Sequence, residues 1–307
     1  MEPIVDVLRL AQFAAAFVLT GGALFALRSL PAHGPVSASA LGWPRTLLIQ
    51  SGAALALLSV AGLIAQTAIV AGSLATVFEP ETVKAVLTSM DMGPASVIRA
   101  LSALLAAVAL LFMPSRAGFA AALALGLIAT ASFAWMGHGA ASEGPGAMLH
   151  LIADIVHLVA AAAWIGALAI FARMAFERRR SPENTQAFHN ALEGFVGLGS
   201  VIVALLIGTG LVNSWFLVGP AGLPELVTTP YGKLLLLKLG LFIAMLGLAG
   251  ANRLHLTPAL KAAKDDPTRT AAAIAALRSS LILEAGAAIA VLAAVAWLGR
   301  MSPITGP

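Results

Sequence analysis

Residues 149–172 read LHLIADIVHLVAAAAWIGALAIFA, an apolar run interrupted only by His150, Asp154 and His157. The run is long enough to cross the bilayer core as a helix, which takes about 20 residues. The spacings place the three polar side chains on one face of that helix, within an arc of roughly 60° and a height of about 10 Å. Such groups are costly in lipid and usually face a protein-lined cavity. This stretch therefore predicts a membrane helix with one polar face turned into a bundle.

The composition extends this interpretation to the whole chain. Hydrophobic residues make up 60% of the 307 residues and charged residues only 10%, whereas soluble domains carry about 25% charged residues. We expect a single polytopic membrane domain over residues 1–307, an all-α integral membrane protein built as a bundle of eight transmembrane helices. The apolar runs lie at 5–27, 47–70, 97–113, 118–136, 149–172, 195–218, 232–250 and 279–299.

Lysine and arginine are distributed unevenly between the two sides of this predicted bundle. The odd-numbered connections hold 12 of them: Arg28, Arg45, Arg116, Arg173, Arg178, Arg179, Arg180, Arg253, Lys261, Lys264, Arg269 and Arg278. The other side and its adjoining helix ends hold 6: Arg9, Lys84, Arg99, Lys233, Lys238 and Arg300. Because cytoplasmic loops carry the excess of basic residues, we expect both termini and the 137–148 loop to be periplasmic.

Several classes of protein are excluded by what the chain lacks. It has no cysteine, which removes disulfides, thiolate metal sites and covalent haem attachment. The basic residues are scattered between apolar spans rather than gathered on a soluble domain, so a nucleic-acid partner is not expected. No hydrolytic or nucleophilic constellation is evident, and we do not expect an enzyme. Residues 80–90 are expected to form a short amphipathic helix on the outer surface.

The polar face of residues 149–172 is flanked by further metal-ligating residue types. Imidazole suits copper, and thioethers select Cu(I). We therefore expect a metal or cofactor site with ligands from His138, His150, His157, Met136 and Met148; if the ion is copper, the thioethers favour Cu(I) and a carboxylate suits Cu(II). The alternative is that the histidines are hydrogen-bonded between helices and the methionines are ordinary core residues.

Four further residues are expected to assist this site. Asp154 is expected to orient a ligating imidazole or to pair with Lys238 or Arg9. Met90 and Met92 lie on another outward loop and are candidates for first capture of the metal.

Elsewhere the chain offers polar residues at the predicted cytoplasmic side. Glu284 is expected to meet Arg253 or Arg278 there, because roughly 10 Å of depth separates it from Lys238. His33, His189 and His255 are expected to be surface histidines. The glycines of 194–199 and 247–250 are expected to be seams for close helix packing.

Residues 150–300 contain a series of motifs: His157 to Trp164 with Ile-Gly-Ala-Leu, Thr209-Gly-Leu-Val-Asn213-Ser-Trp215, Thr229-Pro-Tyr231-Gly-Lys233 to Lys238, Ala251-Asn252-Arg253, Pro258-Ala-Leu, and Arg278 with Glu284. Through these motifs the chain resembles the CopD/PcoD family of copper-resistance inner-membrane proteins. The resemblance implies a protein of the bacterial inner membrane that moves copper from periplasm to cytoplasm, with a separate periplasmic CopC-type chaperone as partner. The motif positions carried over are His157, Asp154, Trp164, Tyr231, Lys238, Asn252, Arg253 and Glu284, with their individual roles open.

Three functional hypotheses remain at this point. The first is passive or gradient-coupled copper uptake, since no nucleotide-binding motif is present. The second is a b-type haem redox protein, although His150 and His157 share one helix and cannot clamp one iron from opposite sides. The third is a copper-binding platform that docks a periplasmic chaperone without transport.

Overall fold

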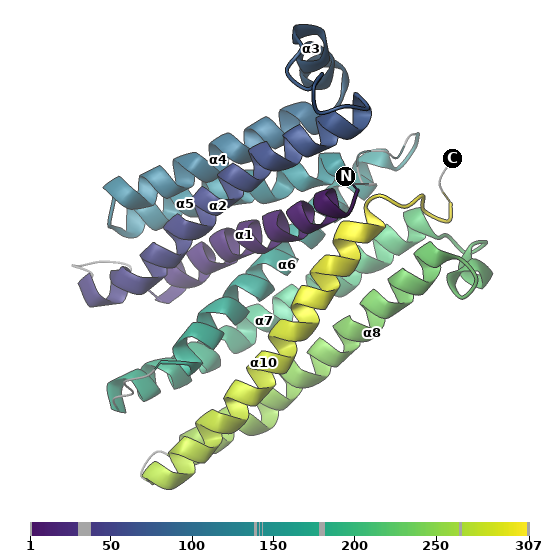
Figure 1. Ribbon diagram of the computed structural model, residues 1–307. Coiled ribbons are helices and arrows are strands. Elements are labelled where there is room, and N and C mark those ends of the chain that lie inside the picture. Colours follow the sequence, from purple (N-terminus) through teal and green to yellow (C-terminus); the bar gives the residue numbers. More distant parts are fainter. Residues whose placement is uncertain are drawn as a thin grey trace.

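The computed structural model describes residues 2–29, 38–137, 140, 142, 144–177, 182–263 and 266–305, and of residues 2 and 38–41 the backbone alone. Within these ranges, eight helical spans are long and apolar enough to cross a membrane, which confirms the predicted all-helical bundle (Figure 1). The spans contain α1 (Glu2–Ser29), α2 (Ala38–Val70), α4 (Met92–Phe112), α5 (Arg116–Ala131) with η1 (Ser132–Met136), α6 (Ala147–Ala175), α7 (Pro182–Leu217), α8 (Pro230–Ala251) and α10 (Pro267–Leu298).

The remaining elements are short. A helix at Pro80–Ser89 (α3) forms where the amphipathic helix was predicted. A 3-10 turn, η2 (Leu223–Leu226), precedes α8, which continues through a π-helical turn, η3 (Asn252–Leu256), into α9 (Thr257–Ala262). The third span begins at Met92, earlier than the predicted residue 97, so that Arg99 lies well inside it.

Helices α8 and α10 each begin with an N-cap side chain followed by a proline. The Thr229 hydroxyl accepts a hydrogen bond from the Gly232 amide at 3.1 Å. The Asp266 carboxylate accepts from the amides of Thr268 and Arg269 at 2.9 and 3.1 Å. A proline follows each of these caps, where its fixed φ and missing N–H suit the first helical turn. These signals set where α8 and α10 enter the bundle.

The centre of the bundle is the crossing of α1 and α6. Helix α1 packs against α2, α5, α6 and α10. At its closest approach to α6, a Cβ atom on Gly21 or on Gly166 would overlap main-chain atoms of the facing helix. Only glycine permits this approach. By contrast, no described neighbour lies within 4 Å of a Cβ placed at Gly194 or Gly247, so the prediction of packing seams within the chain was wrong there.

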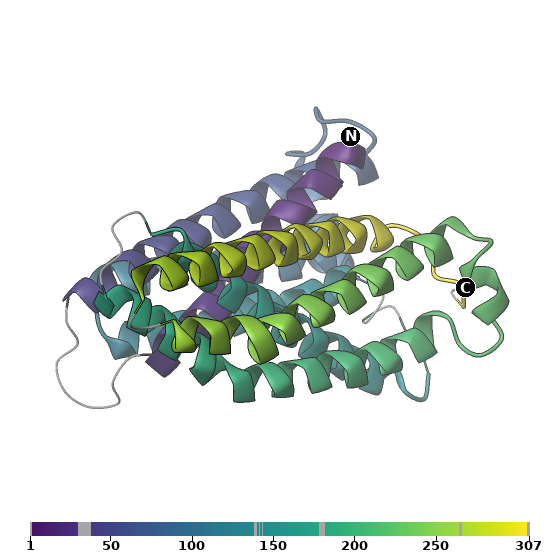
Figure 2. The same ribbon diagram turned by 90° about the horizontal axis from the view of Figure 1, so that it is seen from below.

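The cavity-forming half of the bundle is more open. Helix α7 packs along α6, and α8 packs along α10. Figure 2 shows α7, α8 and α10 side by side along the length of the molecule. In the spans of α7 and α8, only 11% of the most apolar stretch is buried inside the molecule. A cavity lies between the α6–α7 pair and the α8–α10 pair.

The two ends of the bundle differ in their polar contacts. Both termini lie at one end, here called the termini end (Figure 1). At the opposite end, three arginines donate to carbonyls in the last turn of a neighbouring helix: Arg45 to Leu110 and Leu111 at 2.6 and 2.7 Å, Arg116 to Leu27 at 2.7 Å, and Arg278 to Ala175 at 2.7 Å. Helix C-termini leave carbonyls unsatisfied, and these arginines supply the missing donors.

Candidate metal-binding cavity

A cavity of about 390 Å³ lies between α1, α6, α7, α8 and α10. Its lining begins near the termini end at Arg9, Gly137 and His150, and it reaches inward to Trp164 and Met245. Along α6, the fourteen residues from His150 to Trp164 correspond to about 21 Å of depth. The cavity therefore extends from the termini end past the middle of a bilayer core of about 30 Å.

His157 lies halfway along this cavity and has a defined tautomer. Its Nδ1 is 2.9 Å from the Thr209 hydroxyl oxygen of α7. That hydroxyl donates its single hydrogen to the Leu205 carbonyl at 2.6 Å, so it accepts from the His157 Nδ1–H. The lone pair of the neutral ring is then on Nε2. Since no described side chain bonds to Nε2 and the residue lines the cavity, this nitrogen is available as a ligand.

His150 lies two helical turns nearer the termini end and is almost fully buried. Its Nδ1 is 2.6 Å from the Ser142 hydroxyl, and its ring stacks on Phe216 of α7 at 4.7 Å, nearly parallel. The stacking fixes the plane of the imidazole at the upper wall of the cavity.

The two histidines form successive levels along the cavity. Seven residues of helix separate them, which corresponds to about 10 Å. An ion held by His157 at about 2 Å cannot at the same time be bound by His150 without a change of rotamer. Consistent with this spacing, no group of three or more histidine or acidic side chains converges on one point within the described ranges.

Asp154 and Lys238 lie between these levels on facing helices. The Asp154 carboxylate accepts a hydrogen bond from the Asn213 side-chain amide at 3.4 Å, and it interacts electrostatically with the Lys238 ammonium of α8. Both residues line the cavity. Within the described ranges no hydrogen bond or ion pair joins Asp154 to Lys238, so the predicted pairing of these two residues stays a prediction. Arg9 instead donates to the Met136 carbonyl at 2.5 Å.

Met136 does not line the cavity, because its sulfur is bound elsewhere. It accepts hydrogen bonds from Arg99 Nη2 at 2.7 Å and from the Ser96 hydroxyl at 3.7 Å. Arg99 is completely buried in α4 and lies over the Phe133 ring at 3.7 Å from its centroid. This buried arginine was missed in the sequence, where a basic residue beside an apolar run indicated the end of a span.

Arg99 has two further partners. Its guanidinium donates to the Gln12 side-chain oxygen at 2.9 Å and to the Ser132 hydroxyl at 3.0 Å. The arginine therefore joins α1, α4 and η1 beside the cavity.

The other predicted thioethers lie outside the cavity lining. Met148 is 67% exposed and does not line the cavity. Met90 and Met92 flank the junction of α3 and α4, at the termini end but outside the cavity. His138 lies outside the described residues; Gly137, which precedes it, lines the cavity.

The inner limit of the cavity is formed by Trp164, Phe242 and Met245. The Trp164 and Phe242 rings meet edge to face, with centroids 5.9 Å apart. Met245 of α8 is buried and places a thioether in the lining. It was not predicted as a site residue, although it stands seven residues after Lys238 and therefore on the same helix face.

Glu284 lies beyond Trp164 and corrects one prediction. Its carboxylate accepts from Trp164 Nε1 at 2.8 Å and from Asn252 Nδ2 at 3.1 Å. The expected partners are engaged elsewhere: Arg253 with the Ser200 hydroxyl and Arg278 with the Ala175 carbonyl.

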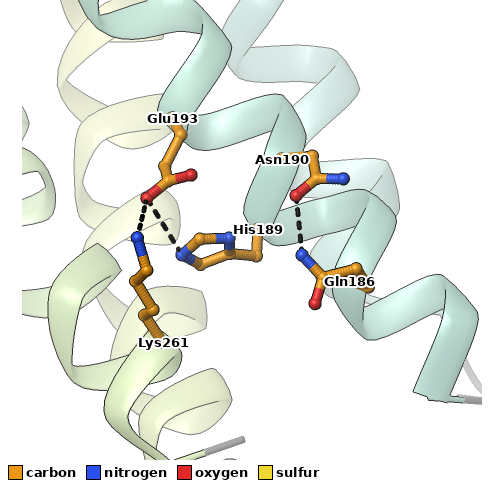
Figure 3. A network of polar contacts seen from close by, with 5 residues as sticks. All are labelled: Gln186, His189, Asn190, Glu193 and Lys261. Carbon is orange, nitrogen blue, oxygen red and sulfur yellow. Dashed lines mark hydrogen bonds and ion pairs between the residues drawn. The ribbon is translucent and has the colours of Figure 1, made fainter.

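A separate polar network lies towards the opposite end on α7 (Figure 3). His189 is buried there rather than at the surface, with Nε2 3.5 Å from the Glu193 carboxylate. Lys261 of α9 pairs with the same oxygen at 3.2 Å, and Gln186 donates to Asn190 at 2.7 Å. The network ties α7 to α9.

Eight apolar spans, with a cavity lined by His150 and His157 between five of their helices, define a polytopic membrane protein with an internal polar site. The Copper resistance protein D-like N-terminal domain family matches residues 1–149, and the Copper resistance protein D family matches residues 189–298. The chain belongs to the copper resistance protein D family.

Similar proteins support this assignment over the full length. The chain is 36% identical to Copper resistance protein D of Pseudomonas syringae pv. tomato over 98% of this chain and 97% of that protein. It is 32% identical to Inner membrane protein YebZ of Escherichia coli over 45% and 47%, and 29% identical to Copper transport protein CutJ of Bacillus subtilis over 39% and 21%. No solved structure matches the chain. The spans and these relatives assign the protein to the inner membrane.

Proposed function

We propose that this protein carries copper across the inner membrane from the periplasm to the cytoplasm, through the cavity between α6 and α8. The observation that carries the proposal is the His157 Nε2 lone pair, directed by Thr209 and available to a cavity that begins at the termini end. Imidazole is a good copper ligand. Membership of the copper resistance family supplies the identity of the ion.

The proposed path uses three levels of ligand. Copper enters at His150, with His138 and the exposed Met148 as candidates for the first contact. It then passes to His157 and next to Met245 beside Trp164. A thioether at the innermost level favours Cu(I). Lys238 and Asp154 both line the cavity, and a positive charge on Lys238 opposes tight binding of the ion.

The orientation completes this proposal. The excess of basic residues lies at the end opposite the termini, so the termini end is periplasmic by the positive-inside rule. Copper then arrives from the periplasm, with a CopC-type chaperone as the proposed donor. Met90 and Met92 lie at the same end and are placed for capture outside the cavity.

Axial haem ligation is less well supported by this geometry. It requires two ligands on opposite sides of the iron, whereas His150 and His157 follow one another on α6. Within the described ranges, the other histidines, His189 and His255, lie away from the cavity lining.

The test is copper flux into proteoliposomes that contain an internal copper indicator. His157→Ala and Met245→Leu are expected to reduce the initial rate at least tenfold, since each removes a ligand from the path. His255→Ala is the matched control, because this histidine is exposed on η3 outside the cavity. Wild-type vesicles that bind copper without accumulating it would replace transport by the platform hypothesis.

A further inference from the structure

A second polar cluster lies on the inner side of Trp164, outside the cavity. Glu284 of α10 is only 4% exposed. One carboxylate oxygen accepts from Trp164 Nε1 at 2.8 Å and the other from Asn252 Nδ2 at 3.1 Å. Both hydrogen bonds come from neutral donors, so they leave the negative charge of the carboxylate uncompensated.

The charge of Glu284 has no cationic partner among the described side chains. Arg253 and Arg278, the partners expected from the sequence, donate to a serine hydroxyl and to a main-chain carbonyl instead. An unpaired charge within a membrane span is expensive. Asp154 in the outer cavity differs, since Lys238 of the facing helix lines the same cavity.

Two further oxygens beside Glu284 are buried without a hydrogen-bond partner. These are Asn252 Oδ1 and Ser280 Oγ, on residues that are 9% and 7% exposed. Asn252 already contacts Glu284 through the nitrogen of the same amide, so its oxygen lies within about 5 Å of the carboxylate by covalent geometry. Ser280 is one helical turn before Glu284, on the same face of α10.

The hydroxyls of the neighbouring residues Ser279 and Ser280 differ in their hydrogen bonding. Ser279 satisfies its hydroxyl by donating to the Ala275 carbonyl at 3.2 Å. Ser280 makes no such bond back to its own helix. Its oxygen therefore remains without a partner, one helical turn from Glu284.

The backbone at Asn252 supports the same conclusion. Asn252 begins the π-helical turn η3, in which the Thr257 amide bonds back to the Asn252 carbonyl. Single π turns inside helices are common at functional sites. This wide turn sets the position of the Asn252 amide against α10.

We propose that Glu284, Asn252 and Ser280 form an inner binding site for a hard monovalent cation such as Na⁺. The donor atoms are a carboxylate, an amide carbonyl and a hydroxyl, which are ligands that hard cations prefer and soft copper does not. One positive charge neutralises the single carboxylate. None of these three residues belongs to the proposed copper path, although Glu284 contacts Trp164 of the cavity lining. The proposed cation site does not depend on copper transport.

The experiment is thermal unfolding of the detergent-purified protein in NaCl and in choline chloride of equal ionic strength. Na⁺ at a hundred times its dissociation constant is expected to raise Tm by about 5 °C. Ser280→Ala is expected to weaken the apparent Na⁺ affinity at least tenfold, and Ser279→Ala to leave it unchanged. Equilibrium dialysis with radiolabelled Na⁺ gives the stoichiometry directly, with one ion per chain expected.

Glu284→Gln completes the test. The Tm of this variant is expected to be the same in NaCl and in choline chloride, because the neutral carboxamide no longer needs a counter-charge. Should this variant fail to fold, the apparent Na⁺ affinities of Ser280→Ala and Ser279→Ala still test the proposed site. Equal Tm values for the wild type in NaCl and choline, with no bound Na⁺, overturn the proposal and indicate a protonated Glu284 instead.

Discussion

Thr209→Val tests the inference that a hydroxyl of α7 sets the tautomer of His157. Valine has nearly the shape of threonine but cannot accept the hydrogen bond from Nδ1, which is 2.9 Å long in the wild type. The Nδ1–H would then be buried without a partner, which costs about 1–3 kcal/mol. The ring can avoid this cost by moving its proton to Nε2, and the lone pair that faces the cavity is then lost.

The expected consequence is weaker copper binding with an intact fold. Removal of a group that orients a ligating histidine typically lowers metal affinity 10–100-fold, which corresponds to about 1.4–2.7 kcal/mol. The measurement is a competition titration of reduced copper against a chelator of known affinity, under anaerobic conditions. Thermal unfolding of the metal-free variant is expected to differ little from that of the wild type.

Ser214→Ala is the matched control. Ser214 also lines the cavity on α7, but its hydroxyl donates to the Gly210 carbonyl at 2.8 Å and does not contact His157. Its copper affinity is expected to equal that of the wild type. The reasoning is refuted if Thr209→Val binds copper as tightly as the wild type while His157→Ala does not, because His157 would then bind copper without help from Thr209.

Three further substitutions test the packing and the buried polar contacts. Trp164→Phe removes the donor to Glu284 and is expected to lower the free energy of unfolding by about 1.5–3 kcal/mol, as measured by denaturant titration in detergent. Gly166→Ala places a methyl group against the main chain of α1 and is expected to lower Tm clearly below that of the wild type. Arg45→Lys keeps the charge but cannot satisfy two carbonyls in the same way, and a loss of about 1 kcal/mol is expected in the same titration.

Each of these has a control in the chain. Trp297→Phe changes an indole that is 56% exposed and is expected to be neutral; an equal loss at both tryptophans would contradict the role of the Trp164–Glu284 bond. Gly240→Ala, where no described atom lies within 4 Å of the added Cβ, is expected to be neutral or stabilising. Arg253→Lys affects one hydrogen bond to Ser200 at 3.0 Å and is expected to lose less than Arg45→Lys.

The sequence predicted the number of spans and the polar face of α6 that lines the cavity, because both follow from spacing along a helix. Apolar length determines a span, and helical spacing determines a common face, so His150, Asp154 and His157 all line one cavity. Depth along a helix also separated Lys238 from Glu284 correctly.

What the sequence did not predict were contacts between neutral partners. Glu284 is bonded to an indole and an amide, and charge pairing gives no signal for these. The Met136 sulfur turns to Arg99 rather than to the histidines, which depends on how η1 packs against α4. Which side chains become hydrogen-bond partners depends on how the helices pack together, and spacing along a single helix does not predict it.

The arginines at the opposite end have a consequence for how the chain is assembled during synthesis. The last carbonyl of α6 receives its hydrogen bond from Arg278 of α10, and α10 leaves the ribosome after α6, α7 and α8. The end of the central helix that carries the histidines is therefore completed only after α10 has been inserted. A nascent chain that stalls before α10 would expose an unfinished helix end in the bilayer, a feature that membrane quality control could recognise.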